Sequence, residues 1–75
     1  MRFFAQAKDA TGCATATVEG TTVDEVLRAA VARYGARLAD IIEISAIWVN
    51  GDFAERGAPV GPGDEVAVLP PVSGG

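Results

Sequence analysis

One segment of the sequence has the spacing of an amphipathic helix, and it limits the folds open to a chain of 75 residues. Apolar or small residues recur between Val23 and Tyr34 at intervals of three and four, which gathers them on one helix face. Thr22 and Glu25 match a capping box before the helix, and Gly35 follows as the expected stop. A single domain of this size must supply the surface that the helix covers.

Segments with the alternation of β-strands lie on both sides of this helix. Before it, an apolar run at residues 1–7 and an alternating segment at 14–18 predict two strands joined by a hairpin, with Gly12 available for a positive φ. After it we expect a short helical turn at 36–43, strands at 47–49, 52–54 and 64–69, and a two-residue hairpin turn at Asn50-Gly51. The order ββαββ, with an extra short helical turn and closing on the last strand, predicts a two-layer α+β domain.

Alternation along these strands also predicts which side chains face the helix. Phe3 and Phe4 are adjacent, so on a strand they point to opposite faces, and we expect Phe3 inside and Phe4 outside. If Val66 and Val68 face the helix, Leu69 lies on the open face of the sheet.

The open face is a candidate partner-binding surface. Phe53, just past the hairpin turn, could join Phe4 and Leu69 there, because exposed aromatic and aliphatic side chains are typical of interface centres. The alternative is that Phe4 or Phe53 belongs to the core. The position of Trp48 is undecided in the same way. Alternation sets its side chain on the face opposite Ile47 and Val49, where it is either exposed or covers a sheet edge.

Composition excludes several classes of function. The chain has one cysteine and no histidine, so we expect no metal site, and Cys13 has no base to activate it as a nucleophile. A net charge of -4 argues against binding nucleic acid or anionic membranes. No apolar run approaches the length of about 18 residues that a membrane span needs, and no secretory signal is recognisable. We therefore expect a cytoplasmic protein.

The sequence closes on a segment that suits chemistry at a chain end. Pro70-Pro71 cannot donate to a sheet, so we expect a folded domain at residues 1–69 and an extended tail at 70–75. Gly74-Gly75 would carry a carboxylate on backbone without side chains, which enters narrow channels and is open to attack. The alternative is an ordinary frayed terminus.

This order of elements, together with the closing segment, resembles the ubiquitin-like β-grasp sulfur carriers, and most of all the small subunit of molybdopterin synthase. The resemblance covers essentially the whole chain and implies a mixed sheet of four to five strands packed on one main helix. The residues that carry it are Phe3-Phe4-Ala5-Gln6, Thr22-Val23-Asp24-Glu25-Val26-Leu27, Val49-Asn50-Gly51 and the whole block from Gly63 to Gly75. The family often has an aromatic residue where Leu69 stands, a mild departure.

The resemblance also implies a chemistry and a set of partners. An ATP-dependent activating enzyme adenylates the carboxylate of Gly75, and sulfur from a donor system then replaces AMP to leave a thiocarboxylate. The carrier docks on the large synthase subunit and gives this sulfur to a pterin precursor, so the active site belongs to the partner and this chain binds no cofactor. The residues implied in partner binding are Phe4, Phe53, Leu69, Pro70, Pro71, Val72, Ser73 and Gly74.

Three alternatives remain open at this point. The chain is a sulfur carrier for thiamine, cysteine or another thio-metabolite; a protein modifier joined to lysines of its targets through Gly75; or an adaptor domain without covalent chemistry. An enzyme in its own right fits least, because the chain has no histidine and no phosphate-binding loop.

Overall fold

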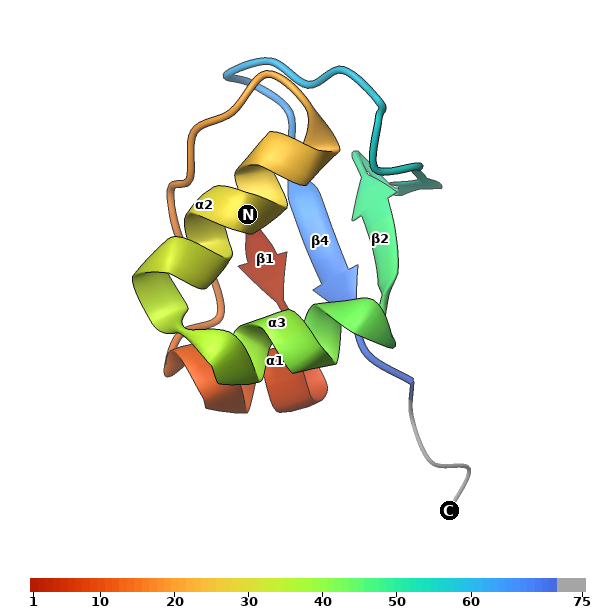
Figure 1. Ribbon diagram of the computed structural model, residues 1–75. Helices are drawn as coiled ribbons and strands as arrows, with labels where there is room; N and C mark the ends of the chain where they lie inside the picture. The colour runs from red at the N-terminus through yellow and green to blue at the C-terminus, as the bar shows by residue number, and fades with distance from the viewer. Residues whose placement is uncertain (72–75) are drawn as a thin grey trace.

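The computed structural model describes residues 1–71 as a four-stranded sheet with three helices (Figure 1). The elements in chain order are β1 (Arg2–Phe3), α1 (Ala5–Thr11), α2 (Val23–Tyr34), α3 (Ala36–Glu43), β2 (Ala46–Val49), β3 (Asp52–Phe53) and β4 (Val66–Leu69). The predicted main helix is confirmed residue for residue, and the predicted helical turn at 36–43 is the two-turn helix α3.

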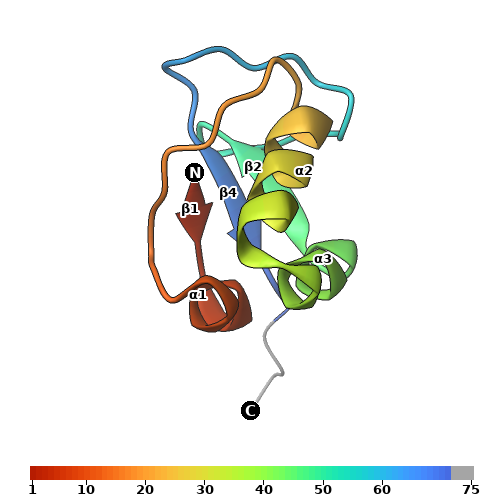
Figure 2. The ribbon, with the colours of Figure 1, turned by 60° about the vertical axis from the view of Figure 1, so that its left-hand side comes forward.

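The sheet is mixed, with the strand order β1-β4-β2-β3. The first strand, β1, lies at one edge and runs parallel to the last strand, β4, which is central. Strand β2 pairs antiparallel with both β4 and β3. Helix α2 lies on one side of this sheet (Figure 2). This arrangement confirms the predicted α+β architecture and the β-grasp type of sheet.

Helix α2 begins where the capping box predicts. The Thr22 hydroxyl accepts a hydrogen bond from the Glu25 amide at 3.2 Å, while the Glu25 carboxylate accepts from the amide and the hydroxyl of Thr21. These two bonds from Thr21 lower the pKa of the Glu25 carboxyl. At the other end, the Gly35 amide donates to the Val31 carbonyl at 2.8 Å with a φ of 99°, which closes the helix as expected.

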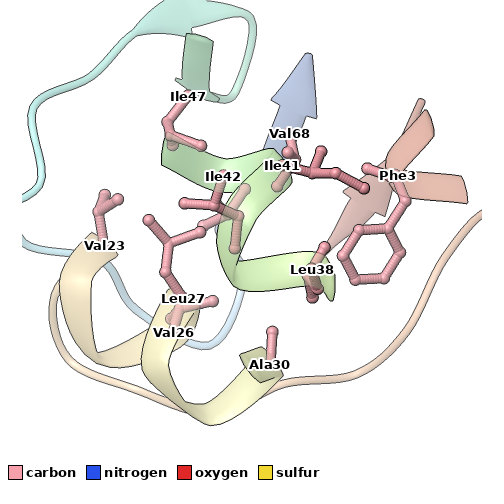
Figure 3. Packing of buried hydrophobic residues seen from close by; sticks show 12 residues of the cluster. Phe3, Val23, Val26, Leu27, Ala30, Leu38, Ile41, Ile42, Ile47 and Val68 are labelled. Carbon is pink, nitrogen blue, oxygen red and sulfur yellow. The ribbon is translucent and has the colours of Figure 1, made fainter. Parts of the chain in front are cut away.

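The core lies between the helices and the inner face of the sheet. Phe3 is 2% exposed and contacts Tyr34 edge to face at 5.6 Å between ring centroids. Figure 3 shows side chains from α2, α3, β1, β2 and β4 converging on one point. The buried apolar residues are Phe3, Ala7, Val23, Val26, Leu27, Ala30, Leu38, Ile41, Ile42, Ile47, Val66 and Val68.

The predicted first hairpin forms only in part, because a helix replaces most of its first strand and its turn. Strand β1 has only two residues, and the segment after it forms helix α1, which ends at Gly12 with a φ of 75°. The Ala-Gln-Ala-Lys composition favours a helix, and burial of Ala7 fixes it against the core. Of the expected strand at 14–18, only the first part pairs with β1: Thr15 bridges to Arg2, the Phe3 amide donates to the Ala14 carbonyl at 2.8 Å, and the Ala16 amide donates to the Met1 carbonyl at 2.9 Å.

The second hairpin is confirmed. Asn50 and Gly51 have φ angles of 51° and 85°, the left-handed pair of a two-residue turn, and β2 and β3 pair on either side of it. The last strand begins at Val66, two residues later than predicted, because Asp64 turns back to bond the Gly61 amide.

Candidate functional site

The open face of the sheet carries the exposed aromatic residues. In β4, Val66 and Val68 are buried while Ala67 and Leu69 are half-buried on the opposite side, as alternation predicts. Phe4 is 41% exposed, so the expectation that Phe3 points inward and Phe4 outward is confirmed.

Trp48 also lies on this face, and its position settles a question that the sequence left open. Its side chain is 37% exposed, and the pairing register places it opposite Ala67 on one side and Phe53 on the other. Directly opposite residues in an antiparallel pair share a face, so Trp48 and Phe53 are neighbours there. Alternation had already set Trp48 on the face opposite Ile47, and its exposure now decides between the two alternatives.

One row of paired residues therefore crosses all four strands. Arg2 of β1 pairs with Ala67 of β4, Ala67 pairs with Trp48 of β2, and Trp48 pairs with Phe53 of β3. We call Phe4, Trp48, Phe53, Ala67 and Leu69 the aromatic face. Phe53, on the outer strand, is 70% exposed.

The aromatic face has a hollow of about 360 Å³ near its middle. The methyl group of Ala67 lies between the longer side chains of Arg2 and Trp48, which explains why the surface is depressed there. The lining residues are Arg2, Phe4, Trp48, Asn50, Gly51, Glu65, Ala67 and Leu69, so two of the predicted binding residues meet here and Phe53 stands outside the hollow.

An ion pair borders the hollow. The Arg2 Nε atom lies 3.0 Å from a Glu65 carboxylate oxygen, and the Arg2 guanidinium carbon lies 5.9 Å from the centroid of the Phe4 ring. Both charged side chains are about half exposed, so the pair itself contributes little to stability. Arg2 and Glu65 were not among the predicted site residues, although their alternation with Phe3 and Val66 places both on the open face.

The hairpin end of the hollow is held by side-chain bonds. The Asn50 carboxamide donates to Asp64 at 2.9 Å and accepts from the Glu65 amide at 2.9 Å. The Gly61 amide and the Asn50 side chain, both donating to the Asp64 carboxylate, lower its pKa, so this group is ionised at neutral pH.

Only the first two residues of the predicted tail, Pro70 and Pro71, are among the described residues. Pro70 is buried, which continues the inward alternation of Val66 and Val68, and Pro71 is exposed. The other predicted tail residues, Val72, Ser73, Gly74 and Gly75, lie outside the described residues.

Two further features of the described residues are a second hollow and a free thiol. A larger hollow of about 570 Å³ lies between residues 17–21 and 60–64 and contains none of the predicted site residues. Hydrogen bonds from Tyr34 and then Thr11, with the nearby charge of Arg33, lower the pKa of the half-buried Cys13 thiol. Within residues 1–71, no three histidine, cysteine or carboxylate side chains are grouped as a metal site, and no helix is long and apolar enough to span a bilayer.

The mixed sheet, the covering helix and a last strand that leads into the chain end define a ubiquitin-like β-grasp protein. The ThiS family matches residues 1–75, and the chain belongs to this family of ubiquitin-like sulfur carriers.

Solved structures agree with this assignment. SAMP1 from Haloferax volcanii superposes with a TM-score of 0.83 at 31% identity, over 99% of this chain and 94% of SAMP1. A second structure of the H. volcanii small archaeal modifier protein 1 gives 0.80 at 28% identity, over 95% and 93% of the two chains. A chain of the Amycolatopsis orientalis BexX/CysO complex gives 0.78 at 24% identity, over 91% and 89%, and supports the fold alone.

Proposed function

We propose that this chain is a sulfur carrier whose Gly75 carboxylate is adenylated and then converted to a thiocarboxylate, and that it serves as the small subunit of molybdopterin synthase. The observation that carries the proposal is the match of the ThiS family to residues 1–75, which includes the closing Gly74-Gly75.

The proposed chemistry follows from the properties of a carboxylate. With a pKa of about 3.5, the terminal carboxylate is ionised at neutral pH and is a poor electrophile. Attack of its oxygen on the α-phosphorus of ATP forms an acyl-adenylate and releases pyrophosphate. A sulfur nucleophile then attacks the carbonyl carbon and AMP leaves. Sulfide gives the thiocarboxylate on Gly75 directly, whereas a persulfide gives an acyl disulfide, which a thiol reductant cleaves to the same thiocarboxylate. The activating enzyme and the sulfur donor supply every catalytic group in these steps.

The aromatic face supplies the binding affinity that the tail lacks. Ordering a flexible segment costs about 1–2 kcal/mol per residue, and glycine loses the most entropy. Glycine side chains cannot offset that cost, so affinity must come from contacts of the folded body. Phe4, Trp48 and Phe53 are exposed on the face that ends in Leu69, from which the chain continues directly into the tail. A partner seated there is placed to receive the tail in its channel.

Two classes of partner follow if the aromatic face provides the docking contacts and the tail provides the reactive group. The activating enzyme must bind the carrier during adenylation, and the large synthase subunit must bind it during sulfur transfer to the pterin precursor. Because adenylation consumes ATP, we expect the chain to act in the cytoplasm.

A second candidate function is protein modification. The H. volcanii relative is named a small archaeal modifier protein, which favours a role in which Gly75 is joined to lysine side chains of target proteins. A carrier for thiamine, cysteine or another thio-metabolite is the third candidate. All three share the activated Gly75, and they differ in the protein or metabolite that receives it.

Reconstitution separates these candidates. The thiocarboxylated chain is mixed with the molybdopterin synthase large subunit from the same genome and the pterin precursor, and dithiolene formation is followed together with loss of sulfur from the chain. We expect product with the full chain and none with a chain that lacks Gly75. Stable binding of another sulfur-accepting enzyme with no dithiolene product, or Gly75-dependent conjugates on denaturing gels, would favour the other two candidates.

A further inference from the structure

The hairpin turn at the edge of the hollow contains a reactive dipeptide. Asn50 is followed by Gly51, and apart from its chain neighbours no atom lies within 4 Å of the position that a Cβ would take at Gly51. In an Asn-Gly sequence the backbone nitrogen of the glycine has no side chain beside it to block attack on the neighbouring carboxamide.

The folded turn restrains this carboxamide at both ends. Its Nδ2 donates to the Asp64 carboxylate at 2.9 Å, and its Oδ1 accepts from the Glu65 amide at 2.9 Å. The Asn50 amide also donates to the Glu65 carbonyl at 2.9 Å. These three bonds, which we call the Asn50 clamp, join the hairpin to the segment before β4.

We propose that Asn50 is a site of spontaneous deamidation, and that the Asn50 clamp suppresses the reaction in the folded chain. The Gly51 backbone nitrogen attacks the Asn50 side-chain carbonyl carbon, forms a five-membered succinimide and releases ammonia. Water then opens the ring at one of its two carbonyls and gives aspartate or isoaspartate. The reaction consumes one water, releases one ammonia and needs no oxidant or enzyme.

The clamp opposes this reaction because attack requires the carboxamide to rotate toward Gly51. Rotation breaks the bonds to Asp64 and Glu65 together, so the reactive geometry belongs to a locally opened hairpin. The turn is short and exposed, and β3 is a two-residue outer strand, so this opening does not require the core to unfold.

Both products would damage the docking surface. An aspartate at position 50 faces the Asp64 carboxylate, which is ionised at neutral pH, across a contact that is now a hydrogen bond. An isoaspartate inserts one more backbone atom into a two-residue turn and disturbs the pairing of Trp48 with Phe53. The consequence for partner binding rests on the proposed function, whereas the chemical reaction does not.

The reaction is measured on the full chain in mildly alkaline buffer at physiological temperature. Peptide mass spectrometry detects the gain of about 1 Da at Asn50 and separates the two product isomers. The same chain unfolded in urea is the reference without a clamp. We expect the folded chain to react at least about tenfold more slowly than the unfolded chain.

Matched variants assign this protection to the clamp. Asp64→Ala removes the Nδ2 partner and should speed the reaction about fivefold, whereas Asp40→Ala on α3 should leave it unchanged. Val68→Ala weakens the core without touching the turn, and below its unfolding temperature it should also leave the rate unchanged. If Asp64→Ala does not fold, Asp64→Asn replaces it, because it weakens the charge-assisted bond while keeping the side-chain shape.

Two results would overturn the proposal. One is a folded chain that reacts as fast as the chain in urea. The other is equal acceleration by Val68→Ala and Asp64→Ala, which would assign protection to global stability. Binding of Asn50→Asp to the large synthase subunit, compared with Asn50→Gly as a control that accepts the positive φ, tests the docking consequence. Absence of binding by the unmodified chain would count against the proposed function and leave the mass measurement intact.

Discussion

Trp48 offers the sharpest test of the aromatic face. A tryptophan side chain presents up to about 250 Å², so an exposure of 37% leaves about 90 Å² for a partner to cover. At about 25 cal/mol per Å², burial of that area contributes about 2 kcal/mol, which is about a 30-fold change in Kd. Trp48→Ala should therefore weaken binding to the large synthase subunit about 30-fold.

The same substitution should also lower the free energy of unfolding, because about 160 Å² of the side chain is already covered within the monomer, which is up to about 4 kcal/mol by the same coefficient. The covered part includes the cross-strand contacts with Ala67 and Phe53, so binding is compared under conditions in which the variant is shown to be folded. Calorimetric titration gives Kd, and urea unfolding gives the free energy of unfolding. Val31→Ala, on α2 and therefore on the helix side, is the matched control and should bind like the wild type. Wild-type affinity of a folded Trp48→Ala chain would refute the assignment of this face.

Four further predictions concern the hollow and the fold. Ala67→Leu should fill the hollow and weaken binding by the same titration, and unchanged affinity would show that no partner group enters it. Thr22→Ala should cost about 1 kcal/mol in urea unfolding because it removes the helix cap, and an unchanged midpoint would argue against the cap. Leu27→Ala should cost about 3 kcal/mol, and a loss under about 1 kcal/mol would contradict its core position. The lowered pKa values of the Glu25 and Asp64 carboxyls mean that the unfolded chain binds protons more readily than the folded chain. Stability should therefore be full above the ordinary pKa values of 4.5 and 3.8 and be lost as the pH falls from these values through the lowered ones; urea midpoints that do not decline in acid would refute this.

Much of the fold could be predicted because several local signals agreed with the tertiary structure. The capping box and the spacing of apolar residues located α2, and Asn50-Gly51 located the second hairpin. Helix α1 was missed because Phe3-Phe4 gives the segment a strand-like start, whereas burial of Ala7 against the core decides its conformation. A contact with distant residues is invisible in a local pattern.

The candidate site was predicted in part for the same reason. Alternation placed Phe4 and Leu69 on the open face and left Trp48 undecided, whereas the structure adds Arg2 and Glu65 and brings all five residues to one hollow. Pairing of β1 with β4 joins the two ends of the chain, and no short sequence window contains both. The Asn50 clamp likewise joins Asn50 to Asp64 and Glu65, which lie 14 and 15 positions further along the chain.

The central claim, that Gly75 is the group that receives sulfur, is tested most directly by the intact mass of the chain. The chain is incubated with the activating enzyme of the same genome, ATP and a sulfur donor, and the C-terminal peptide is then sequenced by fragmentation. Replacement of one oxygen by sulfur predicts a gain of about 16 Da confined to Gly75. An unchanged mass, with all components shown to be active on another carrier, would contradict the account.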